Sequence, residues 1–266
     1  MFREITIGQY YPADSLLHRL DPRVKLFGTI IYLISIFVAG DIFSFAFLAL
    51  FLVMIIRLSK VPFSYMVKGL RGIVLLLVIA GVFNLFMTPG QALVEFGPLT
   101  ISDVGLKNAV LMTARMIFLI IGTSIMTLTT TPNQLTDGLE TSLAPLTIFN
   151  VPVHEIALMM SIALRFIPIL VEETDKIMKA QMARGADFES KGIVRKAKAM
   201  VPLLVPLFVS AFRRASDLAL AMEARCYHGG EGRTKMKPLH YEKEDRLSYV
   251  VIISYLILLI VIRIVL

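Results

Sequence analysis

The chain has 266 residues, of which 56% are hydrophobic, with a mean hydropathy of +0.75 and a net charge of +7. Soluble domains of this length rarely carry so much apolar sequence, and the apolar runs are continuous rather than alternating, so we predict membrane helices rather than a β-barrel. One cysteine excludes an intramolecular disulfide and a cysteine-based zinc site. The positive charge is spread around the apolar segments, which indicates contact with a lipid membrane and no nucleic-acid partner.

The first predicted helix begins at Asp21-Pro22-Arg23. Aspartate is a favoured N-cap residue, and proline is favoured at the first helical position. The basic residues around this start predict that the N-terminus is cytoplasmic.

A long apolar run follows, from Leu26 to Ile56. One helix of this length would be about 46 Å long, well beyond the roughly 30 Å hydrocarbon core. We therefore predict two short crossings that turn at Gly40-Asp41 on the outer side. Ser59–Pro62 forms the next turn, within a basic inner loop that contains Arg57, Lys60, Lys68 and Arg71.

Three further crossings are predicted at Ile73–Met87, Ala109–Leu128 and Ser248–Leu266. Residues 88–108 hold turn signals and read as an external loop with room for a small hairpin. Arg115 lies within the fourth crossing. It either has a function inside the membrane or lies near the outer end and extends to the interface. Five crossings from a cytoplasmic N-terminus place the C-terminus outside.

Residues 129–246 are mixed and basic, although 152–170 and 200–212 are apolar enough to suggest crossings. Two crossings there would place residues 171–199, which carry seven lysines and arginines, on the outer side, against the positive-inside rule. We expect these helices to lie along the inner face instead. The predicted fold is an all-α membrane protein with about five transmembrane helices and a cytoplasmic domain of long amphipathic helices, divided as 1–128, 129–246 and 247–266.

A short sequence motif occurs twice, 41 positions apart: Ala180-Gln-Met-Ala183-Arg184-Gly185 and Ala221-Met-Glu-Ala224-Arg225-Cys226. An arginine in the last turn complements the negative end of a helix, and Gly185 suits a left-handed cap. Cys226 suits that position less well, so the second helix could instead end at Gly229-Gly230. The arginines are either ordinary surface charges or donors that enter acidic or carbonyl-lined pockets of a partner.

No catalytic, metal or cofactor site is predicted. His154-Glu155 has Leu158 where a zinc helix needs its second histidine, and Gly229–Lys235 lacks the Gly-Lys-Ser/Thr ending of a phosphate loop. Any energy input must therefore come from another chain. A self-contained secondary carrier is the alternative, but it predicts ionisable residues deep in several crossings and an internal repeat of them. An intramembrane enzyme would need a nucleophile and base at membrane depth, which the sequence lacks.

The segment Gly8–Leu26, which contains Tyr10-Tyr11-Pro12 and Asp21-Pro22-Arg23-Val24-Lys25, resembles the opening of the transmembrane T component (EcfT) of energy-coupling factor (ECF) type ABC transporters. Ala183-Arg184-Gly185 is similar to the first coupling motif of that family. Ala224-Arg225-Cys226 is similar to the second, with cysteine where glycine is usual. The resemblance extends over essentially the whole chain.

This resemblance implies a non-catalytic scaffold in the cell membrane, with the N-terminus and a coupling domain in the cytoplasm. The implied partners are two ATP-binding cassette ATPase subunits, which hydrolyse ATP, and an interchangeable membrane-embedded S component that captures a vitamin or other micronutrient. Arg184 and Arg225 would dock into the ATPases. Ala183, Gly185, Ala224 and Cys226 would shape the helix ends, and Asp21, Pro22 and Arg23 would have a structural role at the membrane boundary.

Overall fold

The computed structural model describes residues 10–96, 99–186, 188, 193–230, 236 and 238–265. Its elements are helices apart from one hairpin of two short strands, so the predicted all-α membrane class is confirmed. The chain divides into two compact units. The first unit consists of described residues within Gly8–Leu139 and Leu239–Leu266, and the second of those within Glu140–Pro238.

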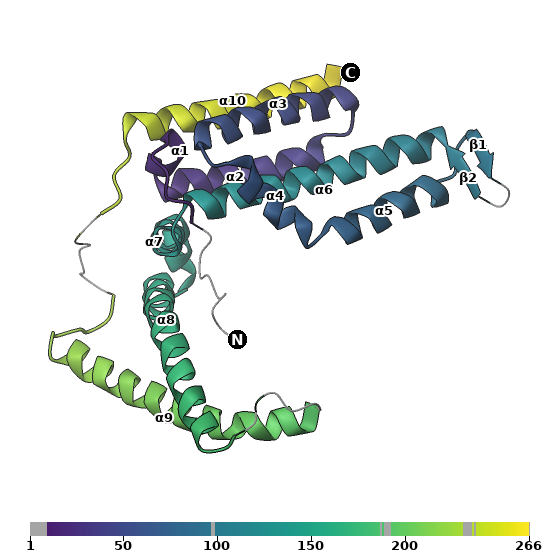
Figure 1. Cartoon of the computed structure of the whole chain (residues 1–266). Helices are drawn as coiled ribbons and strands as arrows, with labels where there is room; N and C mark the ends of the chain where they lie inside the picture. The colour runs from purple at the N-terminus through teal and green to yellow at the C-terminus, as the bar shows by residue number, and fades with distance from the viewer. Residues whose placement is uncertain are drawn as a thin grey trace. The chain divides into compact units, whose positions relative to one another are not determined.

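The first unit includes the last helix of the chain, which packs against α2 and α3 (Figure 1). In chain order its elements are α1 Leu16–Arg19, α2 Pro22–Val38, α3 Ile42–Ser59, α4 Phe63–Arg71, α5 Val74–Met87, β1 Ala92–Phe96, β2 Leu99–Ser102, α6 Asp103–Thr129, the start of α7 Pro132–Leu143, and α10 Lys243–Val265.

The predicted turns are confirmed at residue level. α2 ends at Val38 and α3 begins at Ile42, so the break falls at Gly40-Asp41. The small hairpin in the predicted external loop is present as antiparallel β1–β2. Most of the basic inner loop predicted after α3 is instead a short helix, Phe63–Arg71, which buries Met66 and Leu70.

Among the described residues, four helices are long and apolar enough to cross a membrane: α3, α6, α8 (Val153–Ala183) and α10. A fifth span arises if α4 and α5, bent by 67°, act together. α2 has 17 residues, or about 25 Å, and is not among them. α8 was expected to lie along the inner face. Because length and composition alone would allow it to span, that placement stays a prediction.

Aromatic and small residues hold α2, α3, α6 and α10 together. The Tyr32 hydroxyl donates to the Phe118 carbonyl at 3.1 Å, and a side chain at Gly122 would begin 2.1 Å from the Tyr32 ring. The Tyr255 ring stacks on Phe51 with centroids 3.7 Å apart. α2 and α6 can therefore approach this closely only because residue 122 has no side chain.

The second unit contains η1 Ala144–Phe149, α8 Val153–Ala183 and α9 Ile193–Glu223. α9 includes the apolar stretch 200–212 and continues through Pro202 and Pro206, while α8 continues through Pro168. In Figure 1, α8 crosses α9. Each of these two long helices ends in one copy of the repeated Ala-x-x-Ala-Arg motif.

Candidate functional site

The C-terminal end of α8 carries the first copy of the repeated Ala-x-x-Ala-Arg motif. Gly185 has a left-handed backbone, with a φ of +88°. Its N–H donates to the Met182 carbonyl at 3.0 Å, and the Ala186 N–H donates to the Gln181 carbonyl at 3.0 Å. This pair of bonds is a Schellman cap, which satisfies carbonyls left open at a helix end. Arg184 is the residue at which the helix ends, and its side chain is exposed.

The end of α9 repeats this geometry bond for bond. Cys226 takes the left-handed position, with a φ of +56°. Its N–H donates to the Glu223 carbonyl at 2.8 Å, and the Tyr227 N–H donates to the Met222 carbonyl at 3.0 Å. Arg225 therefore occupies the same cap position as its counterpart in α8. The helix ends here, and the alternative end at Gly229-Gly230 is wrong.

Both arginine side chains are directed to solvent. Arg184 and Arg225 are exposed, as are Ala183 and Ala224 before them. Within the part of the chain that the structure describes, neither guanidinium has a hydrogen bond or an ion pair. Each planar set of N–H donors is therefore open to an external acceptor, which is the arrangement that carboxylates and carbonyls recognise.

Side-chain contacts fix how α8 and α9 cross. Arg214 Nη2 lies 2.5 Å from Glu173 Oε2, and Gln181 Nε2 donates to the Pro202 carbonyl at 3.3 Å. The second contact places the end of α8 beside the first half of α9. Because about 21 residues of α9 follow Pro202 before Glu223, the two arginine-bearing ends lie roughly 30 Å apart.

One exposed face of α9 is apolar. Phe208 is 61% exposed and Phe212 is 71% exposed, and they lie four residues apart on one side of the helix. The other exposed apolar side chains of the face are Met200, Val201, Leu204, Val205 and Val209. This face exceeds the isolated apolar residues normal on a soluble surface and is suited to a lipid or protein partner.

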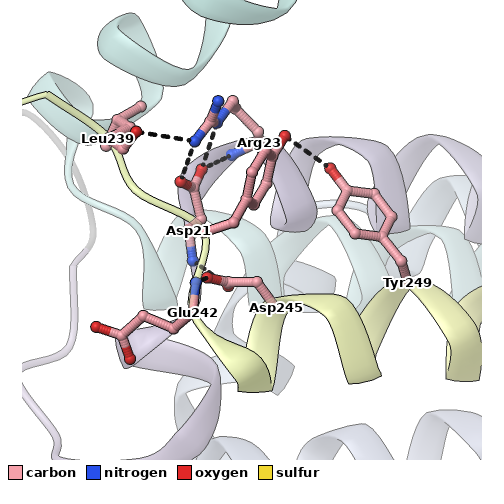
Figure 2. Close-up of polar contacts among 7 residues, drawn as sticks. Asp21, Arg23, Leu239, Glu242, Asp245 and Tyr249 are labelled. Atoms are coloured by element: carbon pink, nitrogen blue, oxygen red, sulfur yellow. Dashed lines mark hydrogen bonds and ion pairs between the residues drawn. The ribbon is translucent and has the colours of Figure 1, made fainter.

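The Asp21-Pro22-Arg23 motif forms the start of α2 (Figure 2). Asp21 Oδ1 accepts from the Arg23 N–H at 2.8 Å and from its Nε at 3.0 Å, while Oδ2 accepts from Nη2 at 2.8 Å. The side chains of Asp21 and Arg23 are only 2% and 13% exposed. Burial raises the pKa of the Asp21 carboxyl, but the hydrogen bonds and charge of Arg23 outweigh burial and leave that pKa below its ordinary value.

The motif joins the starts of two helices that are far apart in sequence. The Asp21 N–H donates to Asp245 Oδ1 at 2.8 Å, and the Glu242 N–H donates to Asp245 Oδ2 at 2.8 Å. Asp245 is 3% exposed. One buried carboxylate therefore binds the backbone at the start of both α2 and α10. The sequence carried a signal for the contact at α10, because Glu242 and Asp245 precede an apolar run at the spacing of a capping box.

Arg23 adds contacts that the sequence gave no reason to expect. Its Nη2 donates to the Leu239 carbonyl at 3.3 Å, and its guanidinium lies 3.8 Å from the centre of the Tyr241 ring. The Tyr241 and Tyr249 hydroxyls lie 3.4 Å apart. Figure 2 shows Arg23, Leu239 and Tyr249 close to the start of α10.

Arg115 lies at the far end of α2 from this motif. Its Nη2 donates to the Ala39 carbonyl at 2.9 Å, and its guanidinium lies 5.6 Å from the centre of the Phe45 ring. Arg263 Nη1 donates to the adjacent Val38 carbonyl at 2.5 Å. Arginines from α6 and α10 thus complete the C-terminal end of α2, where the helix dipole favours positive charge.

The histidine considered as a zinc ligand is paired with a carboxylate. His154 Nδ1 lies 2.9 Å from Glu140 Oε1. Among the described residues, no group of three histidine, cysteine, aspartate or glutamate side chains could hold a metal ion. The phosphate-loop comparison concerns Gly229–Lys235, of which residues 231–235 lie outside the described residues.

Comparisons with known proteins agree with the motif analysis. The CbiQ family model, described as "Cobalt transport protein", matches residues 13–236. The "Energy-coupling factor transporter transmembrane protein EcfT" of Thermosediminibacter oceani is 54% identical over 248 residues, which cover 93% of this chain and 94% of the relative. The relatives of the same name from Clostridium kluyveri and Bacillus subtilis are 53% and 48% identical, over 92% of this chain in each case and 92% and 93% of the relative.

Proposed function

The chain belongs to the CbiQ family in its EcfT branch, the transmembrane energy-coupling components of ECF transporters, and on that basis we propose that Arg184 and Arg225 dock it to two ATPase subunits. Each ATPase would receive one arginine in an acidic or carbonyl-lined groove. The observation that carries the proposal is the matched geometry of the two helix ends. Both arginines occupy the same cap position and are exposed, and no described residue binds them.

We further propose that α8 and α9 transmit ATP-driven motion to a substrate-binding S component. The Glu173–Arg214 ion pair and the Gln181–Pro202 hydrogen bond join the two helices, so displacement of one end is conveyed to the crossing. The exposed apolar face of α9 around Phe208 and Phe212 is suited to hold the S component. The cargo would be a vitamin or another micronutrient captured by that partner.

The proposed arrangement in the membrane follows the charge pattern. The basic residues between positions 171 and 199 support a cytoplasmic location for the coupling region, 129–246, and the N-terminus would lie on the same side. Residues 1–128 and 247–266 would supply the membrane helices. Asp21, Pro22 and Arg23 would serve a structural role at the inner boundary, supported by their buried contacts with α10.

The docking proposal is tested by replacing both arginines with alanine. We expect the Arg184→Ala/Arg225→Ala double variant to insert normally but to lose co-purification of the ATPases and substrate uptake. Single substitutions are less informative, because losses at interfaces are not additive. Lysine at both positions should restore docking only partly, because lysine keeps the charge but not the planar set of donors.

A matched control comes from the same two helices. Arg165 in α8 and Arg213 in α9 are also exposed, but they lie away from the helix ends. The Arg165→Ala/Arg213→Ala double variant removes the same charge and should retain both ATPases. If the variant at the helix ends still bound both ATPases and supported normal uptake, the docking role would be wrong.

A further inference from the structure

An apolar groove lies between α3 and α10 in the first unit. These helices run side by side (Figure 1), and residues of α1, α2 and α6 complete the lining of the groove. Its volume is about 310 Å³, within the range of small-molecule sites. The exposed rim consists of Leu58 and Met54 from α3, Leu247 and Val251 from α10, and Leu16 from α1.

Among the described residues, Lys25 is the one charged side chain that lines the floor of the groove, and it does not need an anionic ligand to balance it. Lys25 is only 7% exposed. Its Nζ donates to the Thr129 carbonyl at 3.0 Å and to the His18 carbonyl at 3.2 Å. The buried ammonium is thus already bound to the carbonyls at the ends of α6 and α1, where helix dipoles favour a cation. The remaining walls are almost entirely hydrocarbon, which suits an acyl chain.

A polar hollow of about 230 Å³ adjoins the groove, and Leu16 lines both. Two cations, Arg19 and Lys60, and two carboxylates, Asp14 and Glu244, surround it. The hollow lies where α3 ends and α10 begins, so its charges are at the end of the apolar segments. The side chains around it carry no net charge.

The charged groups of the hollow are not all engaged. Arg19 makes two hydrogen bonds to Asp14, at 2.9 and 2.8 Å, and Lys60 Nζ donates to the Asp14 carbonyl at 3.2 Å. No other hydrogen bond of Lys60 is formed within the described residues, so two of its three N–H donors are open there. No side chain among the described residues binds the Glu244 carboxylate. The hollow thus offers both a donor and an acceptor that are open.

We propose that the groove and the hollow together bind a phospholipid with an ethanolamine head group. One acyl chain would lie in the groove, with the phosphate at Lys60 and Arg19 and the ammonium at Glu244. The balanced charge of the hollow favours a zwitterionic head group over an anionic one. A primary ammonium donates hydrogen bonds to a carboxylate, which the quaternary ammonium of choline does not.

Native mass spectrometry of the full-length chain in mild detergent tests this site. Phosphatidylethanolamine, phosphatidylcholine and phosphatidylglycerol would be added together at equal concentration. A charge at a membrane surface contributes about 1 kcal/mol, so we expect ethanolamine lipid to be retained over glycerol lipid by roughly fivefold. Leu58→Trp, which places a large side chain on the groove, should lower retention of all three lipids.

The preference should reverse in Glu244→Lys, because the hollow then carries a net positive charge and favours the anionic lipid. Glu172→Lys is the matched control, since it makes the same change at an exposed position of α8, in the other unit. Equal retention of the three lipids by the unmodified chain would overturn the proposal. So would a Glu244→Lys variant with the same lipid preference as the control.

Discussion

The left-handed conformation of Cys226 predicts that glycine at this position stabilises the end of α9. The left-handed backbone costs a residue with a Cβ about 1–2 kcal/mol, whereas glycine adopts it freely. Glycine loses about 0.5–1 kcal/mol more backbone entropy on ordering. The Cys226 side chain is exposed, so its removal costs no packing. We therefore expect Cys226→Gly to stabilise this helix end by about 0.5–1 kcal/mol.

Hydrogen exchange at the cap measures this change directly. The amides of Cys226 and Tyr227 are held by the Glu223 and Met222 carbonyls, so they exchange only when the cap opens. Since 1.4 kcal/mol corresponds to a factor of ten, exchange of these two amides should slow by roughly two- to fivefold in Cys226→Gly.

Two further variants separate the backbone effect from loss of the thiol. Cys226→Ala removes the sulfur but keeps the Cβ, so its exchange should match that of the unmodified chain. Gly185→Cys makes the reverse change at the end of α8, where φ is +88° and no atom lies within 4 Å of an added Cβ, so exchange of the cap amides there should speed up. If Cys226→Gly and Cys226→Ala exchanged at the same rate, the backbone explanation would be refuted.

Two other predictions concern the first unit. Gly122→Ala should destabilise the fold by about 1–3 kcal/mol, because the new Cβ would lie 2.1 Å from the Tyr32 ring; an unchanged melting temperature would contradict the close packing of α2 and α6. Arg23→Ala should cost about 3–5 kcal/mol, because it leaves the Asp21 carboxylate buried without its partner, whereas Arg19→Ala, which breaks an exposed pair, should have a much smaller effect on the melting temperature. The lowered pKa of Asp21 stabilises the fold at any pH above its ordinary value of 3.8, and this contribution is lost as the pH falls through the lower pKa of the folded state; melting curves of Asp21→Asn should therefore lack that acid-dependent loss.

Local signals in the sequence were sufficient for the class of the protein and for many helix boundaries. The break at Gly40-Asp41 and the helix start at Asp21-Pro22 follow from turn and cap preferences, which depend on neighbouring residues. The same signals failed at Phe63–Arg71. A nine-residue stretch with several polar positions reads as a loop until packing buries Met66 and Leu70 on one side.

Some features of the candidate site could likewise be predicted from the sequence, and others could not. The sequence by itself determined that two helices end in the same Ala-Arg motif, because a helix cap depends only on residues that are close together in the chain. Only the tertiary structure decided that Arg115 binds the end of α2 and that Asp245 binds the backbone of Asp21, 224 positions away. Such partners depend on which helices pack together, and packing depends on the shape of whole surfaces rather than on the periodicity of one segment.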